Sequence, residues 1–137
     1  MFKNSMVTLL SVVLLGAGVI GCGQSGPKMY IVKGTVTHNG KPVSKLQVTM
    51  IPDDLKTKAE SMGITDDQGK FDLMVGSVPG VFPGPHTFTA IDPLAAVGGQ
   101  TSKDPDYVEV CKKYAPGSSP LKLHIQKNES NLEVKLD

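Results

Sequence analysis

Apolar and polar residues alternate along most of the chain after residue 30. In the first such stretch every second residue belongs to one face: Tyr30, Val32, Gly34 and Val36. A period of two that includes β-branched residues is typical of a half-buried β-strand. The same spacing predicts seven short strands, over residues 30–37, 46–50, 60–65, 71–75, 86–92, 121–125 and 132–136.

Turn residues separate these stretches. Asn39-Gly40 is a strong hairpin signal, because both residues accept positive φ. Asp66 is expected to accept hydrogen bonds from backbone amides, and Gly69 to take the left-handed conformation. A turn at 128–130 predicts that the last two strands form a hairpin. Short strands at this spacing, without a convincing amphipathic helix, predict an all-β fold, an antiparallel β-sandwich of about seven strands.

One long stretch, residues 93–120, lacks the alternation. A structureless loop of this length is uncommon in a compact domain, so it is functional, partly disordered or contains a short helix. Residues 106–114 are the candidate for one or two helical turns. Tyr107 and Tyr114 in this stretch form a candidate interaction surface. The alternative is that the two rings pin the loop to the core.

The N-terminus has the order of a secretory signal. Lys3 precedes an apolar run, and small residues follow where a peptidase cuts. One alternative is a membrane-spanning helix, but the apolar run is shorter than the roughly 20 residues that such a helix needs. The other alternative is an ordinary signal peptide, with Cys22 near its cleavage site by coincidence. Residues 1–21 are therefore predicted to be a signal peptide, residues 22–29 a tether, and residues 30–137 one domain.

Val19-Ile20-Gly21-Cys22 resembles the lipobox of bacterial lipoproteins. The resemblance implies that the Cys22 thiol receives a diacylglycerol and that the mature chain begins at this residue. Two or three acyl chains anchor a protein stably, whereas a single chain binds only marginally. The expected location is the cell envelope, on the extracytoplasmic side of the outer or the cytoplasmic membrane.

Four motifs of the domain resemble those of the carboxypeptidase regulatory-like domain. They are Val32-Lys33-Gly34-Thr35-Val36, Asn39-Gly40-Lys41-Pro42-Val43, Thr65-Asp66-Asp67-Gln68-Gly69-Lys70-Phe71 and Pro83-Gly84-Pro85-His86-Thr87-Phe88. The resemblance implies a transthyretin-like (prealbumin-like) sandwich, related to the B-type repeats of collagen adhesins. It also implies a non-catalytic accessory, spacer or adhesion module. Phe88 departs from the tyrosine usual in the family, which removes a hydroxyl and leaves the packing intact.

The amino-acid composition of the chain limits the classes of partner that it is expected to bind. The 14 basic residues against 13 acidic ones give a net charge of +1, and every basic residue is lysine. Arginine's planar fork is the usual reader of phosphate and guanine, so its absence argues against nucleic acid as a partner. The sequence has no tryptophan, which weakens the case for a sugar site built on a large aromatic platform.

The candidate metal ligands do not form a recognisable motif. No pair among His38, His86 and His124 has the short spacing of a zinc site, so all three are expected at the surface. The aspartate pairs at 53–54, 66–67 and 104–106 offer oxygens, yet calcium needs six to eight oxygens that converge on one point. The prediction is no metal and no cofactor.

The candidate nucleophiles are equally isolated. The serines lack a Gly-x-Ser-x-Gly elbow. Cys111 stands beside Lys112 and Lys113, which would lower the pKa of a reactive thiol, but no histidine base is near in sequence. The preferred interpretation of Cys111 is a small buried apolar side chain.

Two functions from different classes follow from these observations. The first is a non-catalytic structural or protein-interaction module, held at a membrane by its lipid anchor, with an envelope protein as its partner. The alternative is a lipoprotein that binds a small ligand or a glycan through the 93–120 loop and residues 80–85.

Overall fold

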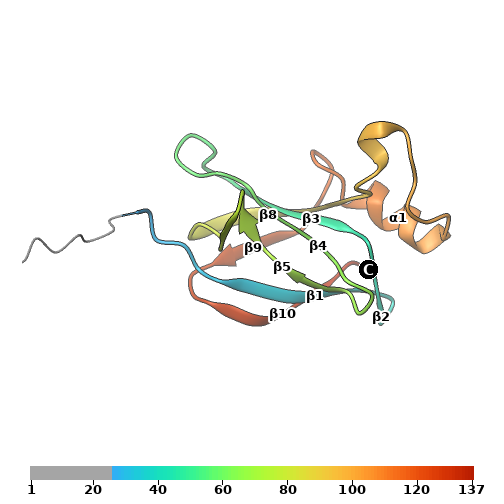
Figure 1. Ribbon diagram of the computed structural model, residues 1–137, viewed down its shortest axis with the longest axis horizontal. Helices are drawn as coiled ribbons and strands as arrows, with labels where there is room; N and C mark the ends of the chain where they lie inside the picture. The colour runs from blue at the N-terminus through green and yellow to red at the C-terminus, as the bar shows by residue number, and fades with distance from the viewer. Residues whose placement is uncertain (1–25) are drawn as a thin grey trace, which may run out of the picture.

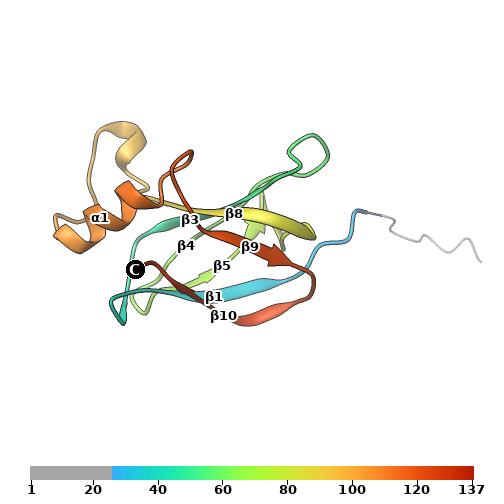
Figure 2. The same cartoon turned by 180° about the vertical axis from the view of Figure 1, so that it is seen from behind.

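The computed structural model of the protein describes residues 26–137. The predicted signal peptide and the predicted lipidation site at Cys22 lie outside these residues. Two β-sheets form a sandwich-like body, and one short helix lies at one end of it (Figures 1 and 2). Within residues 26–137, the predicted all-β sandwich is therefore confirmed as a mostly β fold with two sheets and one α-helix.

The first sheet has four strands, with β1 between β10 on one side and β5 and β2 on the other. These strands are β1 (Val32–His38), β2 (Lys41–Pro42), β5 (Lys70–Asp72) and β10 (Glu129–Lys135). The Asn39-Gly40 turn joins β1 to β2, with φ of +48° and +77° at its two residues. The predicted chain reversal is confirmed, because positive φ at both turn residues matches the twist of the flanking strands. The strand that pairs with β1 after the turn is β2, however, and the predicted strand at 46–50 lies in the second sheet.

The second sheet has six strands in the order β7-β6-β4-β3-β8-β9. They are β3 (Gln47–Pro52), β4 (Ser61–Ile64), β6 (Met74–Val75), β7 (Val78–Pro79), β8 (Gly84–Ile91) and β9 (Lys122–Ile125). All neighbours in this sheet are antiparallel. Each of the seven predicted stretches contains a strand, but the described residues form ten strands.

The three additional strands have simple origins. The stretch at 71–75 divides into β5 and β6, because the chain passes from one sheet to the other at the buried Leu73. The other two, β2 and β7, are two-residue strands beside turns. Period-two alternation cannot show that a strand changes sheets, because the inward residues stay inward on both sides of the crossing.

Two expectations about the C-terminus were wrong. β9 and β10 do not form a hairpin, because β9 pairs with β8 in the second sheet while β10 pairs with β1 in the first. β10 also runs parallel to β1, so the sandwich is not purely antiparallel. The intervening residues cross between the sheets, and the crossing is held where Ile31 N donates to the Asn128 side chain over 2.9 Å. Ile125 and Val134 thereby reach the same core from opposite layers.

The core fills the space between the two sheets. Phe71 of β5 and Phe88 of β8 are both buried, with ring centroids 6.3 Å apart and planes tilted by 56°. Such a tilted pair adds about 1 kcal/mol beyond the area that it buries. Around this pair lie buried aliphatic residues of the strands and of the segments beside them: Val32, Val36, Leu46, Val48, Met50 and Leu73.

The loop at 93–120 contains a 3₁₀ turn, η1 (Ala95–Val97), and the helix α1 (Pro105–Lys113). Asp104 caps α1, because its side chain accepts a hydrogen bond from Asp106 N over 2.9 Å, and Pro105 occupies the first turn. The nine-residue helix is slightly longer than the one or two turns expected. Tyr107 and Val110 are its buried residues, so one face of α1 closes the end of the sandwich.

Candidate functional site

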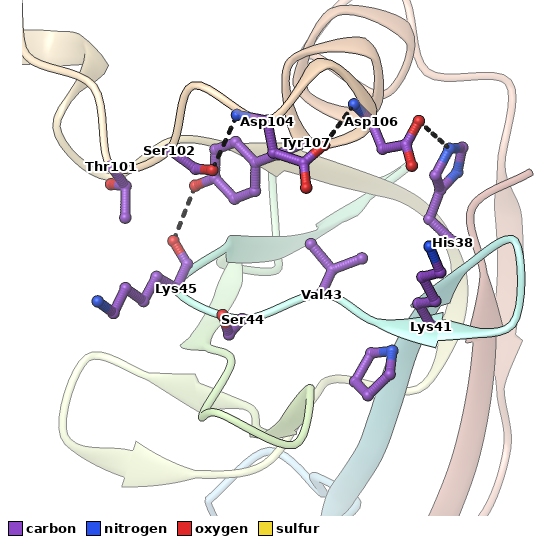
Figure 3. A pocket seen from close by; sticks show the side chains of 11 residues that line it. His38, Lys41, Val43, Ser44, Lys45, Thr101, Ser102, Asp104, Asp106 and Tyr107 are labelled. Carbon is purple, nitrogen blue, oxygen red and sulfur yellow. Dashed lines mark hydrogen bonds and ion pairs between the residues drawn. The ribbon is translucent and has the colours of Figure 1, made fainter.

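A cavity lies between α1 and the hairpin of β1 and β2 (Figure 3). Its volume is about 260 Å³. Residues 38 and 41–45 form one side, and residues between Thr101 and Tyr107 form the other. Sequence reasoning placed a contact surface on the 93–120 loop, but it did not predict that residues 38–45 would face that loop.

Tyr107 fixes the distance between the two sides of the cavity. Its hydroxyl donates a hydrogen bond to the carbonyl oxygen of Lys45 over 2.9 Å. Burial is the main cause that raises the pKa of Tyr107, with Cys111 and Asp92 adding to the effect. The phenol is therefore protonated at any physiological pH and acts as a hydrogen-bond donor.

The predicted interaction surface of Tyr107 and Tyr114 is corrected by the structure. Both side chains are buried, with 7% and 5% of their surface exposed. The Tyr114 hydroxyl donates to the main-chain oxygen of Asp137 over 2.9 Å. The alternative interpretation, in which the rings pin the loop to the core, describes their positions.

Asp92 holds the start of the same loop. Its carboxylate accepts hydrogen bonds from Thr101 N over 2.7 Å and from Leu94 N over 3.0 Å. Burial opposes ionisation of this group, but the hydrogen bonds from Thr101 and Leu94 outweigh it and lower the pKa of Asp92. The carboxylate thus closes a loop of ten residues and places Thr101 at the cavity wall.

His38 lies at the rim of the cavity, and its side chain is only 10% exposed. Its Nδ1 contacts the carbonyl oxygen of Leu136, and the Asn39 side-chain amide donates to its Nε2 over 3.1 Å. The Asp106 carboxylate lies 4.0 Å from the same Nε2. The expectation of surface histidines is wrong for His38 and His86, which are buried, whereas His124 is exposed.

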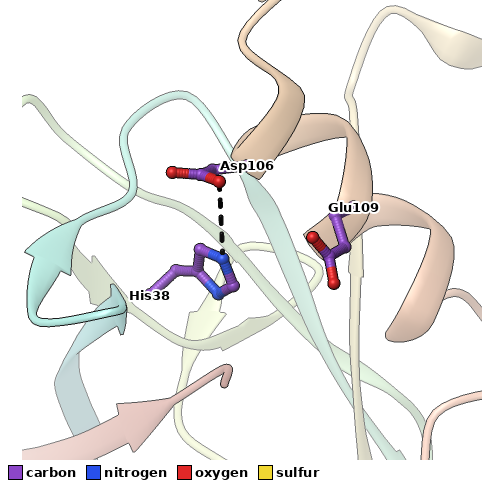
Figure 4. Close-up of side chains that lie close together, drawn as sticks. All are labelled: His38, Asp106 and Glu109. Atoms are coloured by element: carbon purple, nitrogen blue, oxygen red, sulfur yellow. Dashed lines mark ion pairs between the residues drawn. The ribbon is translucent and has the colours of Figure 1, made fainter.

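Glu109 lies beside these two residues (Figure 4). One ligand atom each from His38, Asp106 and Glu109 lies within 4.8 Å of the other two. Sequence spacing could not show this group, because β1 and α1 are far apart in the chain. The only available signal was that Asp106 and Glu109 are three residues apart, which puts both carboxylates on one face of a helix.

The aspartate pairs serve local structure. Asp66 accepts hydrogen bonds from Gln68 N and Lys70 N, and Gly69 has φ of +74°, so the predicted turn is confirmed. Asp53 lies 3.3 Å from Lys122 Nζ. Thr57 donates to the Asp54 carboxylate, which lowers the pKa of Asp54. Asp53, Asp54 and Asp66 thus each have a structural partner.

Cys111 is half-buried against the core. Burial, followed by the negative charge of Asp92, raises the pKa of the Cys111 thiol to about 11. Lys112 and Lys113 do not lower it, so the structure favours the apolar interpretation. The thiol is protonated at neutral pH and is a poor nucleophile.

The loop at 80–85 and the start of the loop at 93–120 lie at opposite ends of β8. Val81 pairs with Tyr30, where the chain enters the sandwich, and β8 runs from Gly84 to Ile91 before the second loop begins. An eight-residue strand is roughly 25 Å long. The start of the 93–120 loop therefore lies far from residues 80–85, whereas the end of the loop lies closer, because the Ser119 hydroxyl donates to the Phe88 carbonyl oxygen in the middle of β8.

Comparisons with known proteins give little further guidance. No protein-family model and no curated protein matches the chain. The structure is similar to that of a DUF3823 family protein from Parabacteroides merdae, with a TM-score of 0.47 and 12% sequence identity. The similarity covers 80% of this chain and 46% of that one, so this chain spans about half of its length.

No helix within residues 26–137 combines the length and the apolar character that a membrane crossing requires.

Proposed function

We propose that this protein is a lipid-anchored lipoprotein of the cell envelope whose β-sandwich binds a partner and catalyses no reaction. The anchor is Cys22, in the lipobox-like sequence Val19-Ile20-Gly21-Cys22. The sandwich belongs, in this proposal, to the carboxypeptidase regulatory-like group with its transthyretin-like fold. The two-sheet body and the turns at Asn39-Gly40 and Asp66–Gly69 support that assignment.

The position of the cavity relative to the tether is the observation that carries the proposal. Residues 26–31 enter at one end of the sandwich, and α1 lies at the other (Figure 1). β1 connects the two ends, from Val32 beside the tether to His38 at the cavity. Seven strand residues span roughly 23 Å. A chain anchored at residue 22 would therefore turn its cavity away from the membrane.

The chemistry of the described residues supports binding over catalysis. The buried hydroxyl of Tyr107 and the thiol of Cys111 both have raised pKa values, which is the opposite of an activated nucleophile. The preferred partner is another envelope protein, which meets the exposed hairpin of β1 and β2 and the outer face of α1. A small ligand or a glycan is the second candidate, favoured by the cavity, whose volume approaches the lower end of ligand pockets.

Lipidation is tested with the full-length chain expressed in a bacterium fed with labelled palmitate. The expected result is label in the wild-type protein and none in Cys22→Ala, together with a shift of the variant from the membrane to the soluble fraction. Cys111→Ala is the matched control, and it should keep both label and membrane location. Equal labelling of wild type and Cys22→Ala would refute the anchor.

Partner binding is tested by photo-crosslinking in intact cells. A photoreactive residue at Lys41, on the exposed β2 beside the cavity, should capture one discrete envelope protein. The control places the same photoreactive residue at Val78 of β7. Val78 is 52% exposed and lies two residues before Gly80, whose backbone is close to Met29. Capture at Val78 but not at Lys41 would contradict the proposal. Thermal stabilisation of the purified chain by a glycan, without protein capture, would favour the second candidate.

A further inference from the structure

His38 presents one nitrogen as a hydrogen-bond acceptor at the rim of the cavity. The Leu136 carbonyl oxygen, which contacts Nδ1, can only accept a hydrogen bond, so Nδ1 must carry the proton. In a neutral ring, Nε2 then has the lone pair. The position of the Asn39 amide agrees with this tautomer, because its Nδ2 can only donate and it contacts Nε2 over 3.1 Å; a bound ion would take the place of this hydrogen bond. A histidine held by a backbone carbonyl at one nitrogen and unprotonated at the other has the form found at metal sites.

Two carboxylates of α1 lie near the His38 ring. Asp106 Oδ1 is 4.0 Å from Nε2, and Glu109 follows three residues later on the same helical face. Within residues 26–137 the Glu109 carboxylate makes no ion pair and accepts no hydrogen bond. Lys113, one turn further along α1, donates instead to the main-chain oxygen of Asp137. The carboxylate oxygens therefore remain available as ligands.

The separation of the three groups is close to what a bound ion needs. Zn²⁺ lies about 2.0–2.1 Å from its nitrogen and oxygen ligands, so tetrahedral ligand atoms are roughly 3.4 Å apart. The three atoms here lie within 4.8 Å of one another, so they need to approach by about an ångström or slightly more. Asp106 and Glu109 are exposed and can make this adjustment by side-chain rotation, whereas the buried His38 supplies the fixed point.

We propose that His38, Asp106 and Glu109 bind a divalent transition-metal ion of the zinc type. Imidazole is a ligand for zinc and its neighbours in the transition series, while calcium and magnesium prefer oxygen alone. Three protein ligands leave at least one coordination position for water or another donor. The site joins the hairpin of β1 and β2 to α1, and two of its ligands, His38 and Asp106, also line the cavity. A bound ion would therefore lie at the cavity rim, where a ligand or partner can complete its coordination.

This inference is independent of the proposed anchor, and its test uses metal alone. The full-length chain is solubilised in a mild detergent, stripped with a chelator, and titrated with Zn²⁺ by calorimetry and with Co²⁺ by visible absorption. We expect one ion per chain, with micromolar or tighter affinity for Zn²⁺, and a Co²⁺ spectrum of nitrogen and oxygen coordination. Ca²⁺ and Mg²⁺ should give no comparable binding. Absence of saturable Zn²⁺ binding, or Ca²⁺ binding of equal strength, would overturn the inference.

Three variants locate the ion. His38→Ala should remove Zn²⁺ binding, but it also removes the contact with Leu136. Asp106→Asn and Glu109→Gln are therefore the decisive substitutions, because they keep the size of the side chain. Each should weaken Zn²⁺ by roughly 10- to 100-fold or more, since even changing a group that only orients a ligand has that effect. His124→Gln, at an exposed histidine of β9, is the matched control and should bind as wild type. Unchanged binding in both carboxylate variants, or loss in His124→Gln, would assign the ion to another place and refute the site.

Discussion

The hydroxyl of Tyr107 donates a hydrogen bond to the carbonyl oxygen of Lys45, 62 residues earlier in the chain. The bond joins the first turn of α1 to the segment that leads from β2 into β3. Because Tyr107 is 7% exposed, both the donor and its ring are largely shielded from water. This contact holds the helix against the sandwich and sets the width of the cavity between them.

Tyr107→Phe is expected to lower the free energy of unfolding by about 1 kcal/mol, because the neutral hydrogen bond from its hydroxyl to the Lys45 carbonyl oxygen is lost. Tyr107→Ala should cost about 3 kcal/mol or more, since it also removes the buried ring. Urea denaturation of the purified chain, followed by circular dichroism, measures both values.

Tyr30→Phe is the matched control for this experiment. Tyr30 is half-buried, and its hydroxyl makes no hydrogen bond with any other residue in the described range 26–137. Its loss should change the free energy of unfolding by no more than a few tenths of a kcal/mol, as expected for a substitution away from a buried network. An equal effect of the two substitutions would show that the bond to Lys45 does not fasten the helix.

The strands and turns of this fold were predictable because each depends on local chemistry. Alternation identifies inward residues such as Val36 and Phe88, and Asn39-Gly40 permits only a narrow set of turns. The pairing of β10 with β1 was not predictable in the same way. A short connection such as that at 126–128 can close a hairpin or cross between sheets, and the choice depends on which layer needs the strand to cover its edge.

The candidate site was even less accessible to sequence reasoning. His38 was expected at the surface because it stands beside a turn, yet the C-terminal residues Val134 to Leu136 return alongside β1 and cover it. Asp106 and Glu109 approach His38 because Tyr107 and Val110 turn the adjacent face of α1 into the core. Contacts between residues so distant in sequence depend on the packing of whole elements, and local patterns do not encode them.

Gly34 is expected to tolerate no side chain. A Cβ at this position would lie 2.3 Å from the Leu132 carbonyl oxygen of β10 and 2.7 Å from the Phe71 ring of β5. The backbone of β10 cannot move away from the added Cβ as a flexible side chain could. Gly34→Ala should therefore destabilise the fold by about 3 kcal/mol, at the upper end of overpacking costs. Gly26→Ala, with nothing within 4 Å of its added Cβ, should be neutral. Similar midpoints of thermal unfolding for the two variants would contradict the close approach of β10 to β1.

Cys111 is expected to react slowly and to make stability depend on alkaline pH. Burial raises its pKa from 9.0 to about 11, so the thiolate fraction at neutral pH falls roughly 100-fold, and alkylation should slow in proportion. As pH rises from 9 to 11 the unfolded chain loses this proton while the native chain keeps it, so the free energy of unfolding decreases. Peptide mapping after timed exposure to iodoacetamide measures the rate at Cys111 alone. Cys111→Ala should remove part of the alkaline loss of stability, and an unchanged pH profile would contradict the raised pKa.

His86 is expected to weaken the fold in acid. It is fully buried, its Nδ1 donates to the Gly84 carbonyl over 2.9 Å, and within residues 26–137 its Nε2 has no hydrogen-bond partner. Burial is the main cause that lowers the pKa of His86 below 6.5, and the positive charge of Lys58 adds to it. As pH falls below 6.5, His86 takes up a proton in the unfolded chain but not in the native chain, so the free energy of unfolding falls.

His86→Phe, which fills a similar volume without a titratable or unpaired nitrogen, should therefore flatten the decline in stability between pH 7 and pH 5, a range that brackets the ordinary histidine pKa of about 6.5. Removing the unpaired Nε2 also offsets part of any packing cost at neutral pH, because a buried polar atom without a partner is itself destabilising. His124→Gln changes an exposed histidine of β9 and should leave the slope as it is in the wild type. Urea denaturation at several pH values gives the three slopes, and a decline in His86→Phe as steep as that of the wild type would mean that another group carries the acid sensitivity.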